Sequence, residues 1–175
     1  MRTFLTKRMA DISLPNVMEL IAAANAARGQ RGVVERAAPP SVSDAERRLD
    51  TLFAVNRTLA VYGTLAPGRP NHYIVAPLGG EWTEGIVEGD LFAEGWGAPL
   101  GYPAFRPRVG GAAVTVHVLT SAALPSAFPE LDQFEGPEYR RILIPVFRPG
   151  AADEQRLHTV ANIYAAAVEP SDSAR

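Results

Sequence analysis

The spacing of the hydrophobic residues changes near residue 56. Before that point, apolar residues recur every three or four positions, which predicts helices with one buried face. One face of a first helix carries four apolar side chains: Val17, Leu20, Ile21 and Ala24. We expect this helix to end at Gly29 and residues 28–41 to form a linker. A second helix is predicted from Ser43, because Ser43 and Glu46 have the spacing of a capping box.

After residue 56, short apolar runs are separated by Gly and Pro, a pattern that is typical of strands. Strands are predicted at residues 59–62, 85–92, 113–119, 142–147 and 157–164, with a shorter one at 102–105. A helix is predicted over 124–134, before Gly136, and a short helix near Asn71, which we expect to cap it. These elements predict an α+β fold, a small barrel or curled sheet covered by helices.

The chain is therefore expected to have three parts. Residues 1–56 form an N-terminal helical extension and linker, residues 57–168 form the main domain, and residues 169–175 form a flexible tail. We expect the barrel to stay folded when residues 1–40 are removed, and the N-terminal helices to be a candidate surface for homo-oligomer formation.

Composition excludes several functions. The chain has 175 residues, of which 47% are hydrophobic and 21% charged, so a sizeable core is available. The net charge of −2 does not indicate binding to nucleic acid or to an anionic membrane. No cysteine is present, which excludes disulfides, thiolate nucleophiles and Cys-ligated zinc. With an N-terminus too polar for a signal peptide, this leads us to expect a cytoplasmic protein.

The histidines offer little metal chemistry. His72, His117 and His158 lie far apart in the sequence and form no recognisable metal-ligand pair. We therefore expect no metal site.

The segment TLAVYGTLAPGRPNH, residues 58–72, begins as a buried strand and changes at Gly63 into a loop rich in Gly and Pro. Its G-x-x-x-x-G spacing is not followed by the Lys and Ser or Thr of a phosphate-binding loop. Gly63 either forms a turn that needs a positive φ, or allows a ligand to approach the backbone closely. The sequence alone leaves both explanations open.

The segment FPELDQFEGPEYRRILIPV, residues 128–146, places four acidic residues near the end of a predicted helix: Glu130, Asp132, Glu135 and Glu138. Acidic side chains are unfavourable there, because the helix C-terminus already carries partial negative charge. They form either a solvated acidic turn neutralised by Arg140 and Arg141, or a site in which one carboxylate has a raised pKa. Glu135 is the best candidate for such a general base.

The two segments together resemble the gamma-glutamylcyclotransferase-like superfamily. VYGTLAPGRPNH is similar to its signature loop, and LDQFEGPEYRR is similar to its segment with a catalytic glutamate. The resemblance covers about residues 59–165 and implies a small mixed β-barrel with flanking helices. It places the catalytic glutamate at Glu135 and later family positions at Tyr139 and Arg141. It also implies that backbone groups of four residues bind the substrate: Tyr62, Gly63, Thr64 and Leu65.

The chemistry that the resemblance implies needs no cofactor. The α-amine of a small γ-glutamyl amide would attack its own δ-carbonyl, giving 5-oxoproline and a free amine. Tyr62 would pack in the barrel, face the cavity, or do both. Trp82, Trp96 and Tyr102 would line either the cavity or the core. The alternatives are a ligand-binding or regulatory module on the same scaffold, and a related amine or amide reaction that uses Glu135.

Overall fold

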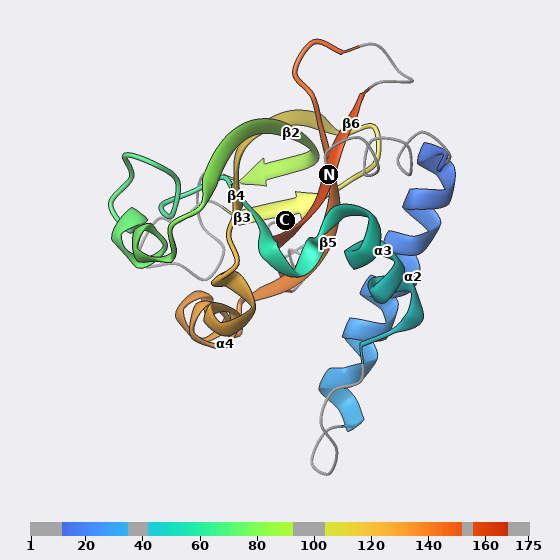
Figure 1. Ribbon diagram of the computed structural model, residues 1–175, viewed down its shortest axis with the longest axis horizontal. Coiled ribbons are helices and arrows are strands. Elements are labelled where there is room, and N and C mark those ends of the chain that lie inside the picture. The colour runs from blue at the N-terminus through green and yellow to red at the C-terminus, as the bar shows by residue number, and fades with distance from the viewer. Residues whose placement is uncertain (1–11, 35–41, 93–103, 152–155, 168–175) are drawn as a thin grey trace, which may run out of the picture.

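The computed structural model describes residues 12–34, 42–92, 104–151 and 156–167. Six strands form one sheet: β1 Thr58–Val61, β2 Glu81–Phe92, β3 Ala104–Pro107, β4 Ala112–Thr120, β5 Tyr139–Phe147 and β6 Leu157–Ala166. Three α-helices lie in the described ranges: α2 Leu14–Val34, α3 Asp44–Phe53 and α4 Leu124–Glu135. The described ranges also contain three short 3₁₀-helices: η1 Val55–Arg57, η2 His72–Ile74 and η3 Ala76–Leu78. The α+β prediction is confirmed (Figure 1).

Five of the strands close into a mixed barrel. The strand order is β3-β2-β4-β1-β6-β5, and a further pairing of β2 with β5 closes the ring, leaving β3 as an additional strand on β2. β1 and β6 run parallel, whereas the other pairs are antiparallel. The closing contact between β2 and β5 has a single paired position, Ile86 with Phe147. Gly85 permits it, because a Cβ there would lie 2.3 Å from Val146 Cγ1.

Alternation along the strands produces an inner and an outer core. The barrel interior is filled by one hydrophobic cluster that includes Phe105, Val116, Ile144 and Ile163, with the ring of Tyr62 packed against it. Outside the barrel, α4 covers one side through Phe128 and Leu131, which belong to a cluster with Leu59 and Tyr164 of the strands. The strands of the barrel therefore pack against apolar side chains both on their inner face and on the outer face that α4 covers.

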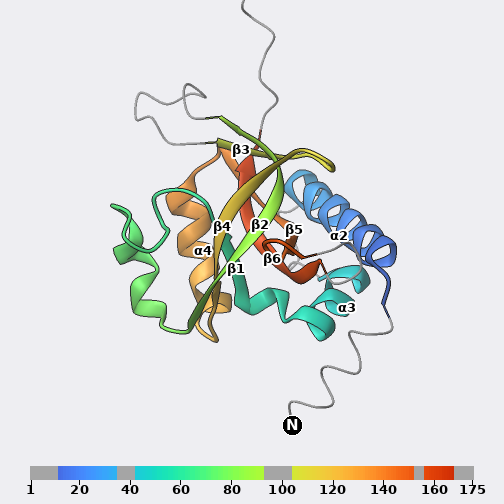
Figure 2. The same cartoon turned by 90° about the horizontal axis from the view of Figure 1, so that it is seen from above.

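The N-terminal helices cover a different side of the barrel from α4 (Figure 2). Their buried side chains, with Val17, Ile21 and Leu49 among them, form a third cluster with Leu143 of β5 and Val160 of β6. The apolar face predicted for α2 is thus used within the chain. Homo-oligomer formation through the N-terminal helices stays a prediction, and it would use a surface other than these buried residues.

Several boundaries differ from those predicted. α2 continues past Gly29 to Val34, since a helical glycine costs only about 1 kcal/mol and the helix is held by contacts to the barrel. β2 and β5 begin earlier than predicted, at Glu81 and Tyr139, and β3 occupies Ala104–Pro107. The tail at 169–175 lies outside the described residues. The division into extension, domain and tail stays a prediction.

Two predicted helix caps have different outcomes. Ser43 caps α3, because its hydroxyl accepts a hydrogen bond from the Glu46 backbone N–H. The predicted capping role of Asn71 is wrong, since its side chain caps no helix and instead donates to the Thr64 hydroxyl at 2.9 Å. A helix of three residues has few free N–H groups, so capping it stabilises little. The Asn71 side chain binds the preceding loop instead.

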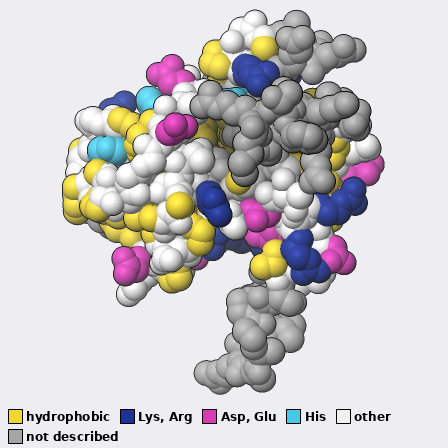
Figure 3. Space-filling model, viewed as in Figure 1, with side chains coloured by type: hydrophobic (Ala, Val, Ile, Leu, Met, Phe, Trp, Pro, Cys, Tyr) yellow, Lys and Arg dark blue, Asp and Glu magenta, His cyan; other side chains and the backbone are white. Residues whose placement is uncertain are grey.

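The surface is unevenly charged. In the space-filling view, charged side chains of both signs are frequent on the side of α2 and α3, and hydrophobic ones are more frequent on the opposite side (Figure 3). None of the described helices is long and apolar enough to cross a membrane.

Candidate active site

The loop after β1 lies at one end of the barrel, beside the end of β6. Because β1 and β6 are parallel, Tyr62 at the end of β1 lies next to the last residues of β6, and its hydroxyl donates to the Tyr164 carbonyl at 2.8 Å. β5 begins at the same end, since Tyr139 pairs with Ala166. Three regions that are distant in the sequence therefore meet here: the loop after β1, the connection from the end of α4 to the start of β5, and the end of β6.

The loop is held in shape through its carbonyl groups. The carbonyls of Gly63 and Thr64 accept hydrogen bonds from the backbone N–H groups of Ala66 and Asn71, at 3.2 and 3.0 Å. The Leu65 carbonyl lies 3.0 Å from His72 Nδ1. A carbonyl only accepts, so Nδ1 of His72 carries the proton.

The N–H groups of the same loop are unused. No described residue accepts a hydrogen bond from the backbone N–H of Gly63, Thr64 or Leu65. Leu65 is buried and its side chain packs in the cluster beneath α4. Three consecutive donors that have no partner among the described residues are available to an anion or a carbonyl oxygen.

Gly63 is not needed to make a turn with positive φ. Among the described glycines, positive φ occurs at six positions, and Gly63 is not one of them: Gly68, Gly79, Gly80, Gly110, Gly136 and Gly150. The explanation by a turn with positive φ is therefore wrong, and close approach of a ligand to the backbone stays a prediction.

Glu135 is the last residue of α4 and is half-buried. The helix ends there because Gly136 adopts φ 77° and donates its N–H to the Asp132 carbonyl. No described residue forms a hydrogen bond or ion pair with the Glu135 carboxylate. Burial without a compensating partner raises its pKa from 4.5 to about 7. A carboxyl group with this pKa can both accept and donate a proton near neutral pH.

The pKa of Asp132, one turn earlier on α4, is shifted in the opposite direction. Partial burial opposes its ionisation, but Arg141 and the Tyr164 hydroxyl donate hydrogen bonds that hold its pKa below the usual value. Arg141 Nε lies 2.8 Å and the Tyr164 hydroxyl 2.7 Å from Asp132 Oδ1. The neutralisation by arginine that the sequence suggested for this acidic segment is thus confirmed for Asp132 and does not extend to Glu135. Glu130 and Glu138 are exposed.

Three tyrosines lie near enough to the Glu135 carboxyl group for its charge to affect their pKa values: Tyr62, Tyr139 and Tyr164. Burial raises the pKa of Tyr62 and Tyr139, and the negative charge of Glu135 raises both further. Burial and the hydrogen bond to Asp132 raise the pKa of Tyr164, and Glu135 again adds to the effect. These phenols stay protonated at neutral pH and can donate hydrogen bonds. Tyr62 also packs on Phe105, with ring centroids 5.6 Å apart, so it serves both the core and this site.

The remaining candidates have mixed outcomes. The Thr64 hydroxyl accepts from Asn71, which is a structural role. Trp82 packs in the cluster beneath α4 and near His72, with ring centroids 5.5 Å apart, so it belongs to the core. Trp96 and Tyr102 lie outside the described residues. In the part of the chain that the structure describes, no group of three or more His, Cys, Asp or Glu side chains is arranged to hold a metal ion.

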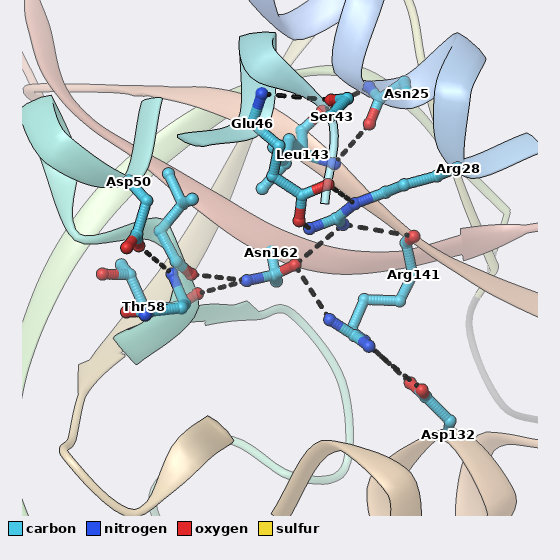
Figure 4. A network of polar contacts seen from close by, with 12 residues as sticks. Asn25, Arg28, Ser43, Glu46, Asp50, Thr58, Asp132, Arg141, Leu143 and Asn162 are labelled. Carbon is cyan, nitrogen blue, oxygen red and sulfur yellow. Dashed lines mark hydrogen bonds and ion pairs between the residues drawn. The ribbon is translucent and has the colours of Figure 1, made fainter. Parts of the chain in front are cut away.

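A buried polar network lies beside the site and was not predicted from the sequence. Asn162 is fully buried and makes four hydrogen bonds: its Nδ2 donates to the carbonyls of Val55 and Thr58, and its Oδ1 accepts from Arg28 and Arg141 (Figure 4). Through Arg141 the network continues to Asp132. The N-terminal helices are thereby connected to the acidic end of α4.

A family model described as gamma-glutamyl cyclotransferase, AIG2-like, matches residues 59–174, which is more than half of the chain. The chain belongs to this family. The matched region contains the loop after β1 and Glu135, so both segments on which the resemblance rested lie within it. Helices α2 and α3 lie before it. No curated protein matches the chain.

Three solved structures are similar to this chain, and one of them, from mouse, reaches a TM-score that supports a shared fold. An AIG2-like protein from Mus musculus is 23% identical with a TM-score of 0.50, over 65% of this chain and 80% of that one. An uncharacterised protein from Pyrococcus horikoshii is 18% identical with a TM-score of 0.45, over the same shares. YkqA from Bacillus subtilis is 23% identical with a TM-score of 0.47, over 63% of this chain and 36% of its own. The mouse protein shares the fold of this chain.

Proposed function

We propose that the protein is a γ-glutamyl cyclotransferase that converts a small γ-glutamyl amide into 5-oxoproline and a free amine, with Glu135 as general acid and base. The main support is the half-buried Glu135 carboxyl group, whose pKa is about 7 and which no described residue pairs with. Family membership supports the same reaction class.

The reaction moves two protons from the attacking nitrogen to the leaving nitrogen, and Glu135 transfers the first of them. A free α-ammonium group has a pKa of about 7.7–8.0, so a carboxylate with a pKa near 7 can accept its proton with little energetic cost. The neutral amine then attacks the δ-carbonyl, and a new C–N bond closes the ring. When the original amide C–N bond breaks, Glu135 returns the proton to the leaving nitrogen, and the ring nitrogen, which became positively charged on attack, loses its second proton to the released amine. Each turnover therefore leaves Glu135 ionised again.

The loop after β1 and the nearby tyrosines can bind and position the substrate. The free N–H groups of Gly63, Thr64 and Leu65 are placed to bind an oxygen of the substrate, either its α-carboxylate or the oxyanion that forms during attack. Tyr62 and Tyr139 lie close enough to Glu135 to restrict the position of the folded γ-glutamyl chain. No covalent intermediate with the protein is needed, which agrees with a chain that lacks cysteine.

The proposal is tested by incubating the protein with a panel of γ-glutamyl amides and measuring 5-oxoproline by mass spectrometry. Time-dependent formation of 5-oxoproline together with an equal amount of free amine would support the proposal. Tight binding of an amide without turnover would instead favour the ligand-binding module, and release of glutamate in place of 5-oxoproline would indicate a related hydrolytic reaction.

The pH dependence of kcat/KM is expected to be bell-shaped. The rate should rise as pH increases through about 7, because Glu135 must be ionised to accept a proton. It should fall above about 8, because the free substrate amine then loses the proton that the leaving nitrogen needs. Initial rates across this range check the prediction, and a profile that stays flat through pH 7 would contradict a role for Glu135 in proton transfer.

Replacing Gly63 by Val is expected to reduce affinity for 5-oxoproline about tenfold or more while lowering the melting temperature by only a few degrees. The added side chain obstructs the backbone N–H groups, whereas Gly63 has no positive φ that would make Val strained. Titration calorimetry and thermal melts measure the two effects. Unchanged affinity would show that the ligand does not approach the backbone at this position.

A further inference from the structure

The last two residues of the segment 58–72, Asn71 and His72, have no part in the proposed reaction. The side chain of Asn71 caps no helix. Both residues are half-buried, whereas residues 67–70, which form the tip of the loop, are exposed. The chain therefore returns from the exposed tip to the barrel at Asn71.

Asn71 and His72 bind back to the two residues at which the loop begins to turn. The Asn71 backbone N–H donates to the Thr64 carbonyl at 3.0 Å, and its Nδ2 donates to the Thr64 hydroxyl at 2.9 Å. His72 Nδ1 donates to the Leu65 carbonyl at 3.0 Å. These three hydrogen bonds, which we call the clamp, join two consecutive residues before the tip to two consecutive residues after it.

The clamp sets the direction of an N–H group that it does not contact. None of the described peptide bonds is cis, so the N–H and the carbonyl of one peptide group point in opposite directions. The Thr64 carbonyl belongs to the same peptide group as the Leu65 N–H. Because Asn71 holds this carbonyl, the free Leu65 N–H points away from Asn71.

His72 acts on the free N–H of Thr64 through one further peptide group. His72 holds the Leu65 carbonyl, whose peptide group also contains the Ala66 N–H. That N–H donates to the Gly63 carbonyl at 3.2 Å. The Gly63 carbonyl shares its peptide group with the Thr64 N–H, so this donor too has a fixed direction.

The ring of His72 also packs against Trp82. The two ring centroids lie 5.5 Å apart, and Trp82 belongs to the hydrophobic cluster beneath α4. The ring therefore contributes to the core, while Nδ1 holds the loop. Only the contact with the loop requires a hydrogen-bond donor.

We propose that Asn71 and His72 are positioning residues, which keep the free N–H groups of Thr64 and Leu65 pointing at a bound substrate oxygen. Neither residue needs to touch the substrate. The proposal rests on the proposed function for the identity of that oxygen, but it assigns the geometry of the donors to side chains that transfer no proton. Donors that are oriented before the substrate binds need no reorganisation when charge develops on the oxygen.

Two substitutions of His72 separate its donor from its ring. His72→Asn places an amide nitrogen at the position of Nδ1 and loses the ring, whereas His72→Phe keeps a ring beside Trp82 and loses the donor. We expect kcat/KM for γ-glutamyl amides to stay within about threefold of the wild type in His72→Asn and to fall by about tenfold to 10²-fold in His72→Phe. Each rate is measured well below the melting temperature of the variant, so unfolding contributes to neither.

Asn71→Ala tests the other side chain and serves as the second variant if His72→Phe does not fold. It removes only the hydrogen bond to the Thr64 hydroxyl, so kcat/KM should fall by about threefold to tenfold. Tyr73→Ala is the control, because Tyr73 follows His72 on η2 and its side chain is exposed. This variant should keep the wild-type rate.

Nuclear magnetic resonance measures the clamp without a substrate. The backbone amide order parameters of Thr64 and Leu65 should be about 0.85 in the wild type and in His72→Asn, as in rigid backbone. In His72→Phe they should fall towards about 0.6, the value of a flexible segment. A fall confined to His72→Phe supports the proposal.

The order parameters also separate this proposal from the proposed reaction. If no γ-glutamyl amide is cyclised, the proposed function fails for the amides tested, and the order parameters still decide whether the clamp orients the donors. Equal order parameters in His72→Phe and the wild type overturn the proposal, with or without turnover. An unchanged kcat/KM in His72→Phe, or a His72→Asn variant as impaired as His72→Phe, overturns it as well.

Discussion

Glu135→Gln is expected to lower kcat by about 10²–10⁴-fold or more while leaving the fold intact. Glutamine has nearly the same shape as glutamate but cannot accept the ammonium proton, and the same group serves both proton transfers. The rising limb of the pH profile near pH 7 should disappear with the activity. Steady-state kinetics on any γ-glutamyl amide that the native protein cyclises would measure the effect, and full activity in the variant would exclude the proposed mechanism.

The same substitution should change stability in a pH-dependent way. The pKa of Glu135 is raised by burial, so the folded protein binds a proton more tightly than the unfolded chain does. Its contribution to stability is present below about pH 4.5 and is lost as pH rises through about 7. Glu135→Gln should therefore melt like the wild type in acid and be more stable above pH 7, by at most about 3 kcal/mol for this shift.

Glu130→Gln and Glu138→Gln are matched controls. Both residues are exposed acids of the same segment, and both variants should retain most of the activity and show no such pH-dependent gain in stability. Asp132→Asn is not an equivalent control, because Asp132 accepts hydrogen bonds from Arg141 and Tyr164. A loss of activity in Glu130→Gln or Glu138→Gln as large as that in Glu135→Gln would move the assignment away from Glu135.

The sequence was sufficient to predict a small barrel or curled sheet and to name Glu135 as the candidate base, because strand alternation and the end of a helix at Gly136 are local features. It could not predict that Asp132 and Glu135 have opposite pKa shifts. Both carboxyl groups lie at the end of the same helix, and their difference comes from Arg141 and Tyr164, which are brought to Asp132 by β5 and β6. Such partners are known only after the strands have been placed.

The buried position of the Arg28 side chain on α2 was not predicted, for a different reason. The apolar spacing predicts a buried face that ends at Ala24, and the composition of residues 28–41 predicts a linker that begins at Arg28. Arg28 lies one helical turn after Ala24 on the same face of the helix. Its position alone therefore indicates that its side chain points towards the barrel. A pattern read only for apolar residues misses a polar side chain that is buried by contacts with another element, as Arg28 is by Glu46 and Asn162.

The second prediction with a large expected effect concerns α2 and the edge of β5 that this helix covers. The seam between β2 and β5 is paired only at Ile86 and Phe147, so the first half of β5 has a free edge. Leu143 points its N–H and carbonyl towards α2, where the Asn25 side-chain amide donates to the carbonyl and accepts from the N–H, both at 2.8 Å. One amide side chain thus replaces the peptide group of a missing neighbouring strand (Figure 4).

Asn25→Leu is therefore expected to destabilise the protein by about 2–4 kcal/mol, because it leaves two backbone groups of Leu143 unsatisfied beneath a helix. Asn16→Leu is the control, since Asn16 is exposed on the same helix, and it should change stability by no more than about 0.5 kcal/mol. Equilibrium denaturant unfolding measures both. Equal stability of the two variants would mean that water satisfies the edge of β5 without α2.

Removal of residues 1–40 should have a larger effect, contrary to the expectation from sequence that the barrel would not need them. The deletion uncovers Leu143 and Val160, removes both hydrogen bonds of Asn25, and leaves Glu46 without the charge of Arg28. We expect a melting temperature lower by more than about 10 °C, or no cooperative transition at all. A truncated chain that melts cooperatively within a few degrees of the full one would show that the barrel is independent of α2. The structure favours the opposite result, because this helix covers the part of the β5 edge that β2 leaves unpaired.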